Sequence, residues 1–217
     1  MAARNLGHYL PDEEPMEQDS MAKAKSRLRL AVVCSSNQNR SMEAHCMLRR
    51  QGFLRVRSFG TGSSVRLPGP TPYMPNVYDF QTTYEQMYED LIRKDEDLYR
   101  HTGILGMLQR NKRIKPRPER FQNCYDMFDL ILTCEESVFW RVVRELNERQ
   151  SVMRKPVNVI NVDIQDDDTE AILGSVLLCH LCHCILLMGN TQKELVELLK
   201  LFEEGLSMPF LHARCFY

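Results

Sequence analysis

Apolar positions between residues 28 and 217 follow two patterns that alternate along the chain. Short runs, either wholly apolar or alternating with polar residues, are typical of strands, whereas apolar residues three and four apart over longer stretches are typical of helices. We expect strands at 30–33, 54–59, 127–134 and 157–162. We expect helices at 41–51, 83–94, 95–109, 137–148, 169–188 and from 191 onward. This alternation predicts an α/β fold of three layers, α/β/α, in which helices cover both faces of a central, mostly parallel sheet.

Four segments fit neither pattern well. Residues 1–26 are polar and acidic, so we expect a disordered N-terminal extension ahead of a single domain at 27–217. Residues 60–79 are rich in Gly, Ser and Pro and predict a long loop, either functional or disordered. The basic segment 110–120, broken by two prolines, is expected to be a loop or an extended arm. The apolar tail 210–217 either adds a short strand or packs on the core.

Length and composition narrow the class of protein. The 217 residues carry a formal net charge of -1, which implies no global attraction to polyanions, and we expect no direct nucleic-acid partner. The eight cysteines are irregularly spaced and the N-terminus has no apolar signal segment, which favours a reduced intracellular compartment. Residues 171–188 have the length of a membrane span, but they include His180 and His183, so a buried core helix and no membrane partner are expected.

The segment from Leu30 to Ser41 carries the strongest functional signal. An apolar strand ends at Cys34, and five small or polar residues lead from it to Arg40 and Ser41, where helical spacing begins. A strand that runs through a polar loop into a helix N-terminus forms an anion site, because backbone N–H groups and the helix dipole converge there. A cysteine at the head of such a loop adds a nucleophile. We therefore interpret this segment as the phosphate-binding loop of a phosphatase.

The side chains of this loop suit phosphoryl transfer. A thiol attacks phosphorus as the thiolate, which a helix N-terminus and a nearby cation stabilise. Arg40 supplies a fixed charge, and its planar fork matches two phosphoryl oxygens. Ser41 can donate a hydrogen bond to the sulfur of Cys34, and the amides of Asn37 and Asn39 can hold the loop and tolerate left-handed backbone. The Cys-x5-Arg spacing alone is weak evidence for a phosphatase loop. Its position between a predicted strand and a predicted helix is what separates it from a chance match.

A general acid is expected in the loop after the strand at 157–162. A departing serine or threonine alkoxide must be protonated, and a positioned acid contributes about 10²–10⁴-fold. Asp167 and Asp168 are expected to cap the following helix. Asp163 and Asp166 remain, and crowding of like charges favours one of them keeping its proton. Both this loop and Cys34 follow strand carboxyl ends, so they can face each other across one crevice.

Two further clusters are weaker candidates. The run Cys179–Cys184 contains three cysteines and two histidines, but on a helix these side chains point in different directions, which favours a structural role over metal binding. The basic side chains within 110–120 could attract an acidic substrate, but a solvated face is the default.

The chain resembles a nuclear phosphatase family whose members dephosphorylate the C-terminal domain of the largest RNA polymerase II subunit. The resemblance extends from Leu30 to Tyr217. It is carried by the segments Val33–Ser41, Arg57–Gly62, Leu67–Pro70, Asn111–Cys124, Asp163–Asp166 and Cys215–Tyr217. It implies a single phosphatase domain with the fold of the low-molecular-weight tyrosine phosphatases and added helices.

The resemblance also implies roles for individual residues. Cys34 would be the nucleophile that forms a phosphocysteine intermediate, Arg40 the phosphate clamp and Asp166 the general acid. Supporting roles would fall to Ser41, Asn37 and Asp163. The rest of the phosphate-binding set would be Ser35, Ser36, Gln38 and Asn39, and the groove for the substrate peptide would be lined by Leu67, Pro68, Tyr99 and Met107.

What the family acts on and with is implied in the same way. The substrate would be phosphoserine 5 of the heptad repeat with the following proline in the cis form. The partner would be a symplekin-like scaffold of the mRNA 3′-end processing machinery. The protein would be located in the nucleus, with the cytoplasm as a second compartment. No cofactor and no metal are expected.

Alternatives remain open at this stage. A low-molecular-weight tyrosine phosphatase would share the loop but usually has an Asp-Pro acid, whereas Asp166 is followed by Asp167. An arsenate reductase would need a relay of redox cysteines, for which Cys46 is poorly placed. A weakened paralogue could serve only as a binding module of the same machinery. The extension 1–26 and the region from Cys179 onward depart from the family pattern.

Overall fold

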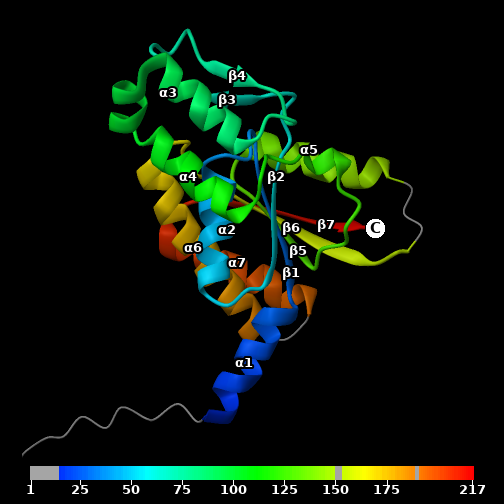
Figure 1. Ribbon diagram of the computed structural model, residues 1–217. Helices are drawn as coiled ribbons and strands as arrows, with labels where there is room; N and C mark the ends of the chain where they lie inside the picture. The colour runs from blue at the N-terminus through cyan, green and yellow to red at the C-terminus, as the bar shows by residue number, and fades with distance from the viewer. Residues whose placement is uncertain (1–14, 150–152, 189–190) are drawn as a thin grey trace, which may run out of the picture.

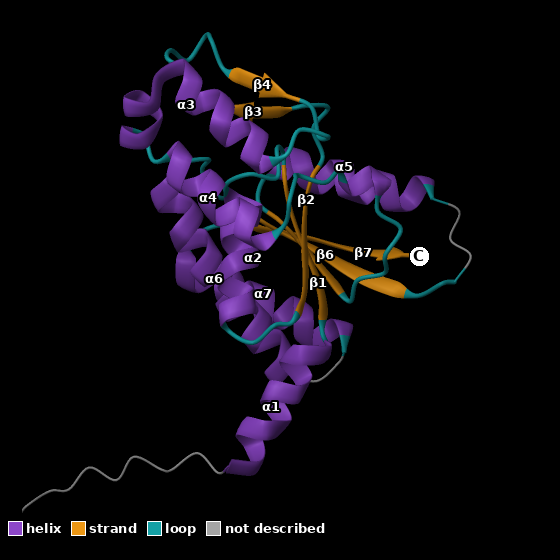
Figure 2. Cartoon of the chain, viewed as in Figure 1, coloured by secondary structure: helices purple, strands orange, loops and turns teal. Residues whose placement is uncertain are grey.

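A mixed five-stranded sheet forms the centre of the molecule. The computed structural model describes residues 15–149, 153–188 and 191–217 (Figure 1). The strands of the main sheet are β1 (Arg29–Cys34), β2 (Arg55–Gly60), β5 (Leu130–Thr133), β6 (Pro156–Val162) and β7 (Phe210–Phe216). They lie in the order β2-β1-β5-β6-β7, with β7 antiparallel to β6 and the other pairs parallel. Figure 2 shows these strands in orange among the surrounding helices. The predicted α/β class is confirmed, and the apolar tail adds a strand.

Helices cover both faces of this sheet. The helices are α1 (Pro15–Arg27), α2 (Arg40–Arg50), α3 (Tyr84–His101), α4 (Ile104–Ile114), α5 (Glu136–Glu148), α6 (Asp168–Leu187) and α7 (Gln192–Leu206), with a 3₁₀ turn at Phe121–Asn123. Side chains of α2, α6 and α7 share one apolar cluster with one face of the sheet, and those of α5 share a second cluster with the other face. Figure 1 shows α2, α6 and α7 on one side of the sheet and α5 on the other. This arrangement is the predicted three-layer sandwich.

The region between β2 and β5 forms an added layer above the carboxyl end of β1. Residues 60–79 were expected to lack strands, but a hairpin of β3 (Val65–Leu67) and β4 (Asn76–Tyr78) lies there. Strands of three residues are too short to show an apolar–polar alternation, which is why the sequence did not predict them. The hairpin packs on α3 and α4 in a third apolar cluster. The predicted break near residue 95 is present, because Asp95 has non-helical backbone and its side chain accepts a hydrogen bond from the N–H of Leu98. The expected helix at 95–109 was wrong, because Gly103 adopts a positive φ of 79° and separates the end of α3 from the start of α4.

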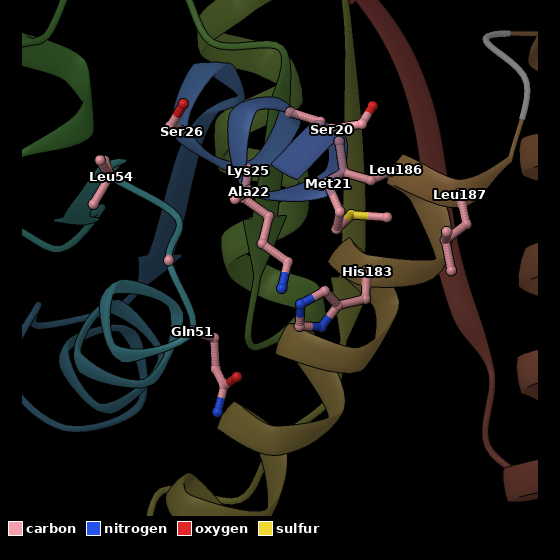
Figure 3. Close-up of a pocket in the computed structure, with 12 residues that line it drawn as sticks. Ser20, Met21, Ala22, Lys25, Ser26, Gln51, Leu54, His183, Leu186 and Leu187 are labelled. Carbon is pink, nitrogen blue, oxygen red and sulfur yellow. The ribbon is translucent and has the colours of Figure 1, made fainter. Parts of the chain in front are cut away.

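Helix α1 corrects the expectation of disorder up to residue 26; residues 1–14 lie outside the described part of the chain. The acidic beginning of the extension dominates its composition, whereas Met21 to Lys25 contain good helix formers. Lys25 places its ammonium 5.9 Å from the centre of the Phe53 ring. A groove of about 900 Å³ separates α1 from the ends of α2 and α6, and Figure 3 shows Met21 and His183 on its walls. This groove is remote from the carboxyl ends of the strands.

Helix α6 is long and apolar enough to cross a membrane by length and composition. Its buried side packs on α2 and places Leu178, Leu181 and Cys182 in the core, as expected for a core helix. Its other side exposes Ile172, Leu173 and Val176. Asp167 caps the helix by accepting a hydrogen bond from the N–H of Glu170, as predicted.

Candidate active site

The loop between β1 and α2 lies at the carboxyl end of a strand that has neighbours on both sides. The ladders pair Cys34 with Gly60 of β2 and Val33 with Thr133 of β5. A Cβ atom on Gly60 would stand 2.7 Å from the carbonyl oxygen of Ser35, so this close approach requires glycine. Asn37 uses its tolerance of left-handed backbone, with a positive φ of 53°, whereas Asn39 has a φ of -105°.

The sulfur of Cys34 is held by the loop itself. Cys34 is 3% exposed, and its Sγ accepts a hydrogen bond from the backbone N–H of Asn37 at 3.3 Å. Its Sγ lies 3.1 Å from Oγ of Ser41, which in turn accepts a hydrogen bond of 3.0 Å from the side-chain amide of Asn37. With Cys34 as a thiol, its S–H donates to Oγ of Ser41. Ser41 and the Asn37 amide thus lie where predicted, and the hydroxyl of Ser41 can donate in return once Cys34 is a thiolate.

Arg40 is buried beside the sulfur, and four of its five N–H groups have acceptors. Its Nη1 donates to the carbonyl oxygens of Cys134 at 3.3 Å and Ile164 at 2.9 Å. Its Nη2 donates to Ser35 Oγ at 3.3 Å and Glu135 Oε2 at 2.9 Å. Its Nε makes no hydrogen bond within the described chain and has only an ion-pair contact, with Asp166. The two terminal nitrogens are therefore fixed by hydrogen bonds, whereas Nε is not.

Charge inside the site follows from these contacts. Burial acts to lower the pKa of Arg40, but the negative charges of Cys34 and Asp166 outweigh it and raise the pKa above its ordinary value. Burial acts to raise the pKa of Glu135, but hydrogen bonds from Ser137 and Arg40 hold it below its ordinary value. The site thus keeps a fixed guanidinium cation and a carboxylate anion together.

The loop after β6 (residues 163–168, the candidate acid loop) approaches the candidate phosphate loop (residues 34–41) through Asp166. Its Oδ1 lies 3.3 Å from Nε of Arg40 and accepts a hydrogen bond of 3.4 Å from the side-chain amide of Asn39, and the side chain is half exposed. Asp163 instead anchors its loop, because its Oδ1 accepts from the backbone N–H of Glu136 and the amide of Asn161, each at 2.9 Å. The two loops enclose an open depression of about 530 Å³.

The added layer braces the outer side of the phosphate loop. Tyr84 donates its hydroxyl to the carbonyl oxygen of Asn37 at 2.5 Å, and Asn111 donates to that of Gln38 at 2.6 Å. The side-chain oxygen of Asn37 accepts from the N–H of Glu119 at 2.9 Å. Three segments distant in sequence thus fix the loop's shape.

The basic segment is not the solvated arm that was expected. Helix α4 continues to Ile114, because Arg110 is held by Glu43 and by the carbonyl oxygen of Gln38. Lys115 donates to the carbonyl oxygen of Ser58 at 2.6 Å, and burial lowers its pKa to about 8. These cations support the fold beside the phosphate loop.

The four expected groove residues lie in the added layer. Leu67, Tyr99 and Met107 belong to its apolar cluster, and Pro68 is exposed. The side-chain amide of Asn76 donates to the carbonyl oxygen of Pro68 at 3.0 Å and to the hydroxyl of Tyr99 at 2.9 Å. Three of these side chains are therefore largely covered in this structure.

Sequence reasoning missed Glu135 and the braces Tyr84 and Asn111. Glu135 follows directly on the third predicted strand, and a carboxylate at a strand's carboxyl end could have been suspected. The braces carry no local signal, because their contacts join residues 47 and 73 positions apart.

The remaining sequence candidate, the run Cys179–Cys184, forms two separate pairs. Cys179 lies beside His183 and Cys184 beside His180, with sulfur–nitrogen distances of 3.9 and 3.6 Å. Across the described residues, no three His, Cys, Asp or Glu side chains gather as metal ligands.

Fold and site together define a class. A parallel strand that ends in a buried cysteine, and a helix that begins with a buried arginine six residues later, are the features of a cysteine-based protein phosphatase. Comparison with known proteins then gives the family. A family model described as Ssu72-like protein matches residues 28–217, and the chain belongs to the Ssu72 family.

Relatives and solved structures agree with this assignment. The Bos taurus protein SSU72, named as an RNA polymerase II C-terminal domain phosphatase, is 64% identical over 192 residues, which cover 88% of this chain and 98% of the relative. The Homo sapiens SSU72 like protein 3 is 57% identical over the same length and the same shares. A crystal structure of Drosophila melanogaster Ssu72 with Symplekin, bound to a cis peptidomimetic of the C-terminal domain phosphorylated at serine 5, matches with a TM-score of 0.84 and 43% identity, covering 88% of this chain and 99% of that one.

Proposed function

We propose that this chain removes phosphate from phosphoserine 5 of the RNA polymerase II C-terminal domain. The observation that carries the proposal is the sulfur of Cys34 held between the N–H of Asn37 and the hydroxyl of Ser41, beside the buried Arg40. The names of relatives that are 57–64% identical support the substrate.

The first chemical step uses the contacts of the loop. The substrate phosphoryl group lies over the loop amides at the start of α2, where the helix dipole favours an anion. The thiolate of Cys34 attacks phosphorus, so that a sulfur–phosphorus bond forms as the phosphorus–serine oxygen bond breaks. Nε of Arg40 makes no hydrogen bond within the described chain, and it can donate to a phosphoryl oxygen once Asp166 gives up its ion-pair contact at 3.3 Å. Nη2 can donate beside it once the bond to Ser35 is given up, which completes a two-pronged clamp.

Asp166 serves both halves of the reaction. Protonated, it delivers its proton to the departing serine oxygen. As a carboxylate, it then removes a proton from the water that attacks the phosphocysteine, and the sulfur–phosphorus bond breaks to restore the thiolate. Half exposure of Asp166 lets substrate and water reach it, and Asn39 keeps it beside the loop.

The groove and the partner extend the proposal beyond the phosphate. Leu67, Pro68, Tyr99 and Met107 are the proposed lining of a groove for a cis Ser–Pro peptide, the kind of ligand bound in the structure of the Drosophila relative. Pro68 is exposed, and the other three side chains must be uncovered for the peptide to reach them. A symplekin-like scaffold is the proposed partner on the same grounds, with action in the nucleus during mRNA 3′-end processing. About 10–30% of X–Pro bonds are cis in flexible chains. At high enzyme concentration the conversion of trans to cis Ser–Pro bonds therefore limits the rate of phosphate release.

The experiment is phosphate release from a phosphoserine-5 heptad peptide, with wild type and Cys34→Ser, each with and without a prolyl isomerase. Release that Cys34→Ser abolishes and the isomerase accelerates supports the full proposal. Faster release from a phosphotyrosine peptide would replace it with a tyrosine phosphatase. Wild-type protein that binds the phosphoserine peptide without releasing phosphate would instead be a binding module.

A further inference from the structure

A second cysteine lies beside Cys34 on the neighbouring strand. Strands β1 and β5 are parallel, with Val33 opposite Thr133, and the N–H of Cys134 donates to the carbonyl oxygen of Val33 at 3.1 Å. The ladder therefore continues by one step, which sets Cys34 and Cys134 opposite each other at the carboxyl ends of the two strands.

The side chains of this pair are on the same face of the sheet. Along β1, Val32 and Cys34 belong to one apolar cluster, whereas Val33 belongs to the cluster on the other face. Along β5, Leu132 and Cys134 belong to the same cluster as Cys34. Neighbouring strands lie about 4.8 Å apart, and disulfides span Cα separations of about 4.4–6.8 Å. The backbone spacing thus suits a direct bond between the two sulfurs.

We propose that Cys34 and Cys134 form a redox modification site, in which a hydroperoxide converts the two thiols into a reversible disulfide. In the first step the thiolate of Cys34 attacks the peroxide, gains one oxygen as a sulfenic acid, and the peroxide is reduced. In the second step the sulfur of Cys134 attacks that of Cys34, the sulfur–oxygen bond breaks, and the hydroxyl leaves with the proton of Cys134 as water. The sum is two thiols and one peroxide giving one disulfide, with water and an alcohol or a second water.

The reduced protein keeps Cys134 out of the phosphatase reaction. Its side chain is fully buried, and burial raises the pKa of its thiol well above the ordinary value. Phosphoryl transfer as proposed makes no use of that thiol. For the disulfide to form, Cys34 must turn its sulfur away from the N–H of Asn37 and the hydroxyl of Ser41. Disulfide and catalysis therefore exclude each other, and the bond protects Cys34 from further, irreversible oxidation.

The inference depends on the proposed role of Cys34 only for its effect on activity, so its primary test is chemical. The full chain is treated with hydrogen peroxide, its free thiols are alkylated, and it is digested without reductant for mass spectrometry. Trypsin isolates Cys34 within residues 30–40. A second protease that cleaves before aspartate cuts at Asp126 and Asp129 and so separates Cys124 from Cys134. We expect a cross-linked pair of the Cys34 and Cys134 peptides that disappears on treatment with dithiothreitol. Cys34 recovered as sulfinic acid, or joined to another cysteine, would overturn the proposal.

A variant tests the protective role separately. Each protein is scored as the fraction of its own starting activity that dithiothreitol restores after peroxide. Wild type and the matched control Cys46→Ser, a half-buried cysteine on α2, should recover almost fully. Cys134→Ala should recover to about a tenth or less of the wild-type fraction, because thiols do not reduce sulfinic acid. Equal recovery would overturn the proposal. Should Cys134→Ala fail to fold, or the wild type show no phosphatase activity, the mass measurement on wild type still decides the matter.

Discussion

Glu135 holds Arg40 through Nη2 of its guanidinium, whereas Asp166 lies nearest to Nε. Oε2 of Glu135 accepts from Nη2 at 2.9 Å, and the same oxygen accepts from Ser35 Oγ at 3.2 Å. One carboxylate thereby joins the first residue after Cys34 to the last residue of the loop. The loop is braced by an ion pair between the first residue of α2 and a residue that follows the carboxyl end of β5.

Substitution of Glu135 by alanine should lower kcat. Without its acceptor, Nη2 of Arg40 turns away from the position that completes the clamp, and misplacement of a catalytic group costs about 100-fold at most. Glu135→Gln, which keeps an acceptor oxygen, should recover much of the loss. Steady-state kinetics on a phosphoserine peptide measure both. The control is Glu136→Ala, whose exposed side chain contacts Trp140 instead. Unchanged kcat in Glu135→Ala would refute the positioning role.

Replacement of Asp166 by asparagine should affect substrates according to their leaving group. A serine alkoxide needs protonation, so release from a phosphoserine peptide should fall by about 10²–10⁴-fold. Formation of the phosphocysteine from an aryl phosphate, followed as a burst of phenolate, should change far less. Asp167→Asn is the matched control, since asparagine caps a helix as well as aspartate does. An equal loss of phosphocysteine formation with both substrates would contradict the role of general acid.

Gly60→Ala should deform the phosphate loop. The new Cβ would stand 2.7 Å from the carbonyl oxygen of Ser35 and 3.1 Å from the N–H nitrogen of Asn37, and both are backbone atoms. We expect a loss of kcat/KM on the order of 100-fold from a shift of about 1 Å. Circular dichroism and thermal unfolding would separate local from global damage. Gly205→Ala, where the added atom meets nothing within 4 Å, should retain activity.

His45 should make the fold less stable in mild acid. Burial, with help from Lys115 and Arg49, lowers its pKa to about 4 from 6.5. Between pH 4 and 6.5 the unfolded chain binds more protons than the folded chain. The contribution of His45 to the free energy of unfolding is therefore fully present above pH 6.5 and is lost as the pH falls towards 4. From pH 7 to 5 the loss is on the order of 2 kcal/mol. Urea unfolding at both values should show this in wild type and in the exposed control His101→Gln, but much less in His45→Gln.

The residues that we propose to act on phosphate were accessible from the sequence because they follow each other in one loop. Cys34, Arg40 and Ser41 are ordered by a strand, a turn and a helix, and each of these leaves a periodic signal. Asp166 was also accessible, since parallel strands bring their carboxyl ends to one edge. The strands of the main sheet and the helices α2, α5, α6 and α7 lie within a few residues of their expected positions for the same reason, whereas β3, β4 and the boundary between α3 and α4 were not predicted.

What the sequence did not reveal depends on contacts without a period. Glu135 was overlooked because its acceptor role requires knowing that β5 lies beside β1. The basic residues Arg110 and Lys115 were expected in solvent, since only the folded chain brings Glu43 and the carbonyl oxygen of Ser58 to them. Helix α1 was missed because the composition of a segment says little about one half of it.

The hydrogen bond from Arg40 to the carbonyl oxygen of Ile164 joins residues 124 positions apart. Closing so large a loop is entropically costly, and contacts of this kind form slowly. The clamp is therefore complete only after β1, β5 and β6 have assembled. In a refolding experiment, helical signal should return first and phosphatase activity last, so that recovered activity reports the population of fully folded molecules.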